Sequence, residues 1–227
     1  MGVKKAHWYH VYASGNWKYI YDLHATALRD GGLAEELGDQ LYLGIVGTEE
    51  ERQECKEHVA ASGLPFTVVA EQDLGWEQVT QNALYNHISS FEEESYVLYS
   101  HTKGATYGEG EVNSSNWRAA MTYWNVVRWK TVEEYLDNGC QLAGCHWQKG
   151  APLQPSYFAG TFWWAKASTL RAIPPPRQDS RWDAETWIGV APWILPGLQL
   201  VDLFPTGPGA APTADAISQI PPVIKFP

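Results

Sequence analysis

Three short segments of the sequence carry side chains that could do chemistry. The first, residues 99–105, reads Tyr-Ser-His-Thr-Lys-Gly-Ala. A lysine ammonium meets a phosphate as a point charge, and the glycine beside it leaves backbone amides open as further donors. His101 and Thr102 add a titratable ring and a hydroxyl to Lys103 and Gly104. The segment predicts a phosphate site, and an ordinary polar turn is the alternative interpretation.

The second segment, residues 158–166, reads Phe-Ala-Gly-Thr-Phe-Trp-Trp-Ala-Lys. Gly160 permits the close approach of a ligand or of another backbone. Consecutive residues of a strand point to opposite faces, so we expect at most one of Trp163 and Trp164 to face a ligand and the other to be core. The candidate acceptor- or sugar-binding residues are therefore Gly160, Thr161, Trp163 and Trp164.

The third segment, residues 181–189, contains two acids in a short stretch, Asp183 and Glu185. Either carboxylate could act as the general base that deprotonates an acceptor hydroxyl. On a helix the two side chains diverge by about 200°, so only one can face a given pocket. The alternative for Asp183 is that it caps the helix.

Composition narrows the classes of function. The 227 residues carry a net charge of −10, which argues against a broad nucleic-acid surface but leaves room for a local basic pocket. The 12 Trp and 12 Tyr suit stacking on sugar rings or nucleobases. No G-x-G-x-x-G, Walker loop or nucleophile elbow is present, so dinucleotide oxidoreductases and P-loop enzymes lose their main support.

The cysteines and the apolar runs predict a cytoplasmic protein. Cys55, Cys140 and Cys145 are odd in number and do not form a disulfide framework. Cys140 and Cys145 are expected to be a buried pair of strand thiols, because no second cysteine or histidine pair completes a metal cluster. No apolar run reaches the roughly 18 residues that span a bilayer. The first residues lead into a polar strand and do not resemble a signal peptide.

Strand and helix patterns alternate through the first hundred residues. Strands are expected at 7–13, 41–46, 66–70 and 96–100, and helices at 16–31, 49–61 and 76–90. This order predicts an α/β fold with a mostly parallel central sheet flanked by helices. Ligands of such sheets lie at the carboxyl ends of the strands. The predicted binding loops are therefore those at strand ends, namely 12–16, 100–104 and 148–150.

The rest of the chain is expected to continue this architecture. A loop at 104–115 leads into one long helix over about 116–135, and strands follow at 141–147 and 157–165. The proline-rich residues 205–227 cannot form a long helix or sheet, yet they are too apolar for a free tail. They are expected to pack across the body or onto a partner subunit.

Four motifs in order resemble a group of small bacterial and phage glycosyltransferase-like proteins. They are His-Thr-Lys-Gly at 101–104, Asn-Trp-Arg at 116–118, the segment 159–174 with its double tryptophan, and Trp-Asp-Ala-Glu-Thr-Trp-Ile-Gly at 182–189. The resemblance covers roughly residues 8–190, and the group is similar to the glycosyltransferase-A fold. It implies one domain over 1–204, with a nucleotide-sugar-binding half at 7–105 and an acceptor half at 106–204.

The resemblance also implies roles for individual residues. The end of the first strand would contact the nucleoside, and the end of the fourth would hold the rest of the donor. The implied donor-binding residues are Tyr12, Ala13, Ser14, Asn16, Ser100, His101, Thr102, Lys103 and Gly104. The D-x-D motif that normally holds Mn²⁺ or Mg²⁺ in that fold is absent, and Lys103 could neutralise part of the leaving diphosphate instead. Whether a divalent metal is needed stays open, with His101 as its candidate ligand.

The predicted function is transfer of a sugar from a nucleotide-sugar, with a UDP-sugar as the first choice, to a hydroxyl acceptor. The acceptor is a saccharide, a protein or a modified base in DNA, although the acidic charge makes nucleic acid a poor partner. Two alternatives remain: a carbohydrate- or nucleotide-binding module without catalysis, and a phage or bacterial assembly protein. A homodimer formed through the tail is the expected assembly.

Overall fold

The computed structural model describes residues 3–106, 111–151, 154–207 and 210–226. The first half alternates strands and helices as expected from the sequence: β1 (Lys5–Tyr12), α1 (Trp17–Asp30), α2 (Leu33–Leu37), β2 (Leu41–Val46), α3 (Glu49–Ala61), β3 (Thr67–Gln72), α4 (Gln78–His87), the short 3-10 helix η1 (Ile88–Ser90) and β4 (Tyr96–His101). Each of these strands pairs in parallel with its neighbour in the first half.

The second half consists of shorter elements. They are α5 (Val112–Thr122), the π-helical η2 (Tyr123–Val127), α6 (Trp129–Asp137), β5 (Leu142–Gly144), β6 (Trp147–Gln148), β7 (Tyr157–Phe158), β8 (Trp163–Lys166), α7 (Ala167–Ala172), α8 (Trp182–Thr186), η3 (Ile188–Val190), α9 (Ala191–Ile194), β9 (Gln199–Asp202), α10 (Ala214–Ser218) and β10 (Val223–Lys225). Strands β8 and β10 run antiparallel to their neighbours, and β5 and β9 are parallel to each other.

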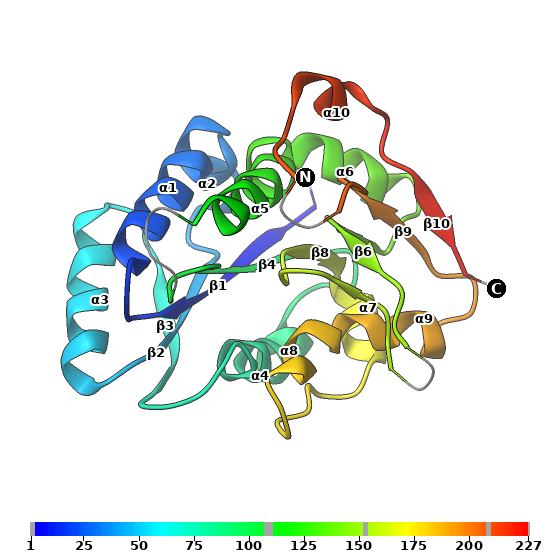
Figure 1. The fold of residues 1–227 in the computed structure, drawn as a ribbon. Coiled ribbons are helices and arrows are strands. Elements are labelled where there is room, and N and C mark those ends of the chain that lie inside the picture. Colours follow the sequence, from blue (N-terminus) through cyan, green and yellow to red (C-terminus); the bar gives the residue numbers. More distant parts are fainter. Residues whose placement is uncertain (1–2, 107–110, 152–153, 208–209, 227) are drawn as a thin grey trace.

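One large sheet joins the two halves in the strand order β10-β9-β5-β8-β4-β1-β2-β3. Helices cover both of its faces: α1, α5 and α6 lie on one side, and α4, α7, α8 and α9 on the other (Figure 1). This confirms the predicted α/β class, with a mostly parallel central sheet flanked by helices. Alternation along β1 supplies both cores, because Tyr9 packs on the α1 side while Trp8 packs on the α4 side.

The predicted long helix is wrong at its centre, where η2 widens into a π-helical turn between α5 and α6. Two side-chain contacts accompany the change of helix type there. The Trp164 indole donates to the backbone oxygen of Asn125 at 2.8 Å, and the Asn125 amide donates to the backbone oxygen of Met121 at 2.9 Å. A partner 39 residues away thus binds this turn, which no periodicity in the helix itself could reveal.

The two strands predicted at 141–147 and 157–165 are each split in two. Left-handed backbone at His146 (φ 59°) separates β5 from β6, and left-handed Gly160 (φ 89°) and Thr161 (φ 57°) separate β7 from β8. The backbone amide of Ala159 donates to the oxygen of His146 at 3.1 Å, so the two breaks lie against each other. A Cβ on Gly160 would lie 2.7 Å from the Met121 sulfur, which explains why glycine is needed there.

The tail packs on the body of the domain. Strand β10 pairs with β9, and the Tyr135 hydroxyl donates to the backbone oxygen of Pro221 at 3.2 Å. Among the residues that the structure describes, no helix is both long and apolar enough to cross a membrane.

The three cysteines are buried free thiols, as the sequence predicts for Cys140 and Cys145. Cys55 belongs to α3, while Cys140 and Cys145 flank β5. Burial raises the pKa of the Cys55 thiol to about 12 and also raises the pKa of Cys140 and Cys145.

Candidate functional site

Charged and polar side chains gather where β1 and β4 end. His10 and His101 are partners in the register of these two parallel strands, so both rings lie on the α4 side of the sheet. Both residues are buried. The His10 ring forms a 2.8 Å hydrogen bond through Nδ1 with the Thr80 hydroxyl of α4.

His101 connects the two halves of the chain. Its Nε2 lies 2.8 Å from the backbone oxygen of Gly160. A carbonyl can only accept, so Nε2 carries the proton. Burial lowers the pKa of His101 to about 4, and the Glu77 carboxylate opposes this shift. Its Nδ1 lies 3.4 Å from the Glu77 carboxylate, at the start of α4.

Lys103 is a buried cation beside this pair. Its Nζ lies 4.3 Å from the centre of the Trp117 ring, and no carboxylate of the described residues lies within ion-pair distance of it. Burial lowers the pKa of Lys103, although Glu185 and Glu77 partly oppose the shift. Gly104 follows with left-handed backbone (φ 85°), which turns the chain away from the strand end. Lys103 is therefore a poorly hydrated cation that the carboxylates of Glu185 and Glu77 attract without a direct ion pair.

Glu185 reaches the cluster from α8. Two amides of α4 hold this short helix in place: Gln78 donates to the backbone oxygen of Ser180 at 2.5 Å, and Gln81 to that of Ala184 at 3.0 Å. Burial raises the pKa of Glu185, and the nearby Lys103 and Arg181 oppose that shift. Glu185 and Lys103 therefore share one electrostatic environment, although 82 positions separate them in the chain.

Asp183 does not join this cluster. Its carboxylate accepts a 2.7 Å hydrogen bond from the backbone amide of Ser180, three residues earlier. The bond does not cap α8, because the N-cap residue of that helix is Arg181 and no side chain caps it. The divergence of the two acids thus directs Glu185 to the cluster and leaves Asp183 at the start of α8.

The loop after β1 lies against the segment after β4. The backbone amide of Tyr12 donates to the Thr102 hydroxyl at 3.0 Å, and that of Asn16 donates to the backbone oxygen of Ala105 at 3.0 Å. The buried Oδ1 of Asn16 has no hydrogen-bond partner among the described residues. Ala13 is buried and Ser14 is half-buried in the same loop. The two predicted donor-binding segments are thus adjacent, with one unsatisfied acceptor between them.

Ser100 lies outside the cluster. Its hydroxyl forms a 2.8 Å hydrogen bond with His7 Nε2 on the opposite side of the sheet, because neighbouring residues of a strand face opposite ways. Thr102 is buried and is used by the backbone of Tyr12, as described above.

Trp163 and Trp164 face opposite sides of β8, as expected, but both rings belong to the core. Trp163 is fully buried and stacks on Tyr99 with ring centres 5.2 Å apart. Trp164 is 2% exposed and packs on the α1 side. Neither ring is open to a sugar. Gly160 and Thr161 are also buried, and Gly160 enters the cluster only through its backbone oxygen.

The donor set at the cluster does not fit a divalent cation. Among the described residues, no group of three or more His, Cys, Asp or Glu side chains is arranged to hold a metal. His101 has one ring nitrogen committed to Gly160, and Lys103 places a positive charge next to the other.

Sequence reasoning missed four members of the cluster: His10, Glu77, Trp117 and Arg181. Glu77 precedes α4 and looks like a surface acid, and His10 sits within an aromatic strand. Only the position of His10 could have indicated a site residue, since it lies near the end of the predicted first strand. Glu77 and Trp117 arrive through packing of helices that the sequence alone does not place.

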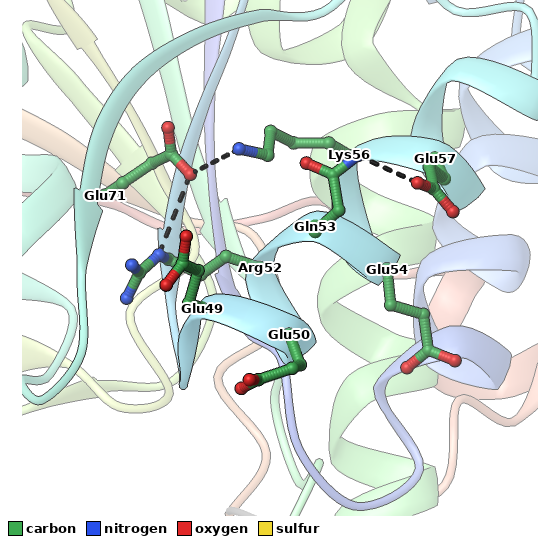
Figure 2. A pocket seen from close by; sticks show the side chains of 8 residues that line it. All are labelled: Glu49, Glu50, Arg52, Gln53, Glu54, Lys56, Glu57 and Glu71. Atoms are coloured by element: carbon green, nitrogen blue, oxygen red, sulfur yellow. Dashed lines mark hydrogen bonds and ion pairs between the residues drawn. The ribbon is translucent and has the colours of Figure 1, made fainter.

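A second, shallow depression lies on α3 and β3 (Figure 2). Five glutamates, two cations and Gln53 line it. Glu71 pairs with Lys56 at 2.9 Å and with Arg52 at 3.7 Å. This is a solvated, internally paired surface, and none of the predicted site residues belongs to it.

Comparison with known proteins adds little to the fold. No family model matches the chain, and no curated protein does. Among solved structures it is similar to 4-diphosphocytidyl-2C-methyl-D-erythritol synthase from Anaerococcus prevotii DSM 20548, with a TM-score of 0.39 and 10% identity over 74% of each chain. A likeness at this level leaves the assignment of function to the residues of the cluster.

Proposed function

We propose that the protein transfers a sugar from a nucleotide-sugar donor, a UDP-sugar first of all, to a hydroxyl acceptor. One observation carries the proposal: Glu185, a base candidate with a raised pKa, and Lys103, a buried cation without an ion pair among the described residues, act on each other at the carboxyl ends of β1 and β4. This is the edge of a parallel sheet at which ligands of α/β proteins bind. The motif resemblance found in the sequence supports the same reading.

The donor lies with its diphosphate toward Lys103 and Arg181. Both cations act on the same cluster, and the pKa of Lys103 is lowered by burial and by Arg181 while Glu185 and Glu77 oppose the shift. An anionic diphosphate would compensate this charge. The nucleoside contacts the loop after β1, where the unpaired Oδ1 of Asn16 is ready to accept a hydrogen bond.

The acceptor hydroxyl is activated by Glu185. A carboxylate whose pKa is raised is a stronger base than an ordinary surface acid. The acceptor oxygen forms the new bond to the anomeric carbon as the bond from that carbon to the diphosphate breaks. Glu185 takes the acceptor proton, and Lys103 stabilises the charge on the departing diphosphate.

A thermal-shift panel of UDP-, GDP-, CMP- and dTDP-sugars, each with and without Mn²⁺, tests donor binding. A ligand at about 100 times its Kd stabilises the folded state by about 2.7 kcal/mol. For a chain of this size that corresponds to a rise in Tm of roughly 5–10 °C. We expect such a rise with one nucleotide class and no dependence on Mn²⁺.

Two outcomes would count against the proposal. No shift with any donor would remove the nucleotide-sugar site itself. Binding without donor hydrolysis or transfer, in the presence of saccharide acceptors, would instead favour the binding module without catalysis.

A further inference from the structure

A groove of about 450 Å³ lies on the other side of the sheet from α8, between α1 and the α5–η2 segment. Its walls are largely apolar: Leu23 of α1 faces Ala119, Tyr123 and Val127 of the opposite segment. Leu23 is 44% exposed and Val127 is 38% exposed, so these apolar side chains stand open to solvent. The groove is therefore accessible from outside and lined by surface that favours an apolar occupant.

Arg118 in the floor of this groove is a buried charge without an acidic partner. The residue is 8% exposed, and its guanidinium donates to the backbone oxygen of Lys103 at 2.9 Å and to the Ser115 hydroxyl at 3.4 Å. Both acceptors are neutral, and no carboxylate of the described residues forms an ion pair with it. Buried charges in proteins are normally paired, so this cation is suited to an anion from outside the chain.

Two further features mark the groove as built for binding. Tyr9 lines its floor, and the buried Tyr9 hydroxyl has no hydrogen-bond partner among the described residues. The wall formed by Tyr123 and Val127 is the π-helical turn η2, a costly backbone form that recurs at functional sites. The unpaired hydroxyl and the widened turn are independent of the charge on Arg118.

We propose that this groove binds a small amphipathic anion. Its apolar body, aromatic or acyl, lies between α1 and η2, and its carboxylate, sulfonate or phosphate group pairs with Arg118. The site lies beside the cluster around Glu185, and its occupancy does not depend on the proposed sugar transfer. Two residues connect them: His101 lines the groove and also faces Glu77, and Arg118 donates to the backbone oxygen of Lys103.

A pair of fluorescent probes tests the proposal on the intact protein. We expect 8-anilinonaphthalene-1-sulfonate, which carries the anion, to bind more tightly than N-phenyl-1-naphthylamine, which lacks it. Arg118→Gln is expected to weaken the sulfonate probe by about tenfold or more, because a hydrogen bond to a charged group is worth that much in affinity. The uncharged probe should be affected far less. The matched control is Arg128→Gln, an exposed arginine just beyond η2.

A second variant keeps the test decisive if Arg118→Gln misfolds. Ala119 is exposed in the groove wall, so Ala119→Trp fills the groove without altering the core. It should abolish binding of both probes while the circular dichroism spectrum stays that of the parent. Unchanged probe binding in Ala119→Trp, equal affinity of the parent for the two probes, or a folded Arg118→Gln protein that binds the sulfonate normally would each overturn the proposal.

Discussion

The two halves of the sheet contribute to the cluster in different ways. In the first half the strands β1 to β4 are parallel. His10, His101 and Lys103 lie at or near the carboxyl ends of two of these strands, β1 and β4. In the second half the strands are short and of mixed direction, and Glu185 comes from a five-residue helix held by α4. The first half places imidazoles and a cation on a rigid edge, and the second brings the acid to them.

This difference has a consequence for how the chemistry can vary. A residue at a strand end is positioned by hydrogen bonds along the whole sheet, whereas α8 is positioned by a few side-chain contacts. We therefore expect replacement of the acid to have little effect on the sheet. The same contrast holds at Gly160, whose backbone oxygen reaches His101 from a left-handed turn in the second half.

The largest expected effect concerns the acid from the second half. Glu185→Gln removes the proposed base but keeps the shape of the side chain, and it should lower kcat by about 10²–10⁴-fold, the usual contribution of general base catalysis. Steady-state rates of sugar transfer measure it. Asp183→Asn is the matched control, because that side chain serves the backbone of Ser180. Equal loss in both variants would show that α8 has only a structural role.

The next prediction tests whether the two halves of the chain unfold as one unit. Trp164→Ala opens a cavity in the core that α1, α5 and β8 share and removes the bond to Asn125, so it should cost about 3–5 kcal/mol of unfolding free energy. Denaturant unfolding followed by circular dichroism and by fluorescence measures this loss. Trp193→Ala, at a residue that is 60% exposed, should change stability by less than about 0.5 kcal/mol. Two separate transitions in Trp164→Ala would mean that the halves unfold independently.

The smallest effect is in the pH dependence of kcat/KM, to which each half contributes one limb. The pKa of Glu185 is raised, so the base is lost as the pH falls through that raised value. The pKa of Lys103 is lowered, so the cation is lost as the pH rises through that lowered value. We expect a bell-shaped profile that falls about tenfold per pH unit outside the two limits. Lys103→Arg should move only the alkaline limb upward; movement of the acid limb instead would contradict the assignment.

Sequence periodicity was sufficient for the first half because its order comes from local patterns. The apolar stripe of α1, the capping box of Thr48 and Glu51 on α3, and the buried run of β4 are all visible in short windows. The second half is decided by distant contacts. Trp164 reaches into η2, and the left-handed turns at His146 and Thr161 interrupt runs that otherwise look like continuous strands.

The same distinction applies to the cluster. Lys103 and His101 were predictable because a strand end is a local feature of the sequence. Glu185 was one of two candidate acids whose side chains diverge by about 200° on a helix. Glu77 and Trp117 were missed because helix packing brings them in. Trp163 and Trp164 were predicted to include a sugar-binding ring, but both rings are buried in the core. Aromatic residues that suit stacking on a sugar also suit a core, and only their burial distinguishes the two uses.

The three buried cysteine thiols can be used to measure local opening of the structure. The thiolate is the reactive form of cysteine, and burial raises the pKa of all three thiols, so alkylating reagents reach them only when the surrounding structure opens. Cys55 records the opening of α3 in the first half, and Cys140 and Cys145 record the opening around β5 in the second. The alkylation rates of these cysteines, measured by mass spectrometry, therefore report the opening of each half separately, without any introduced labelling site.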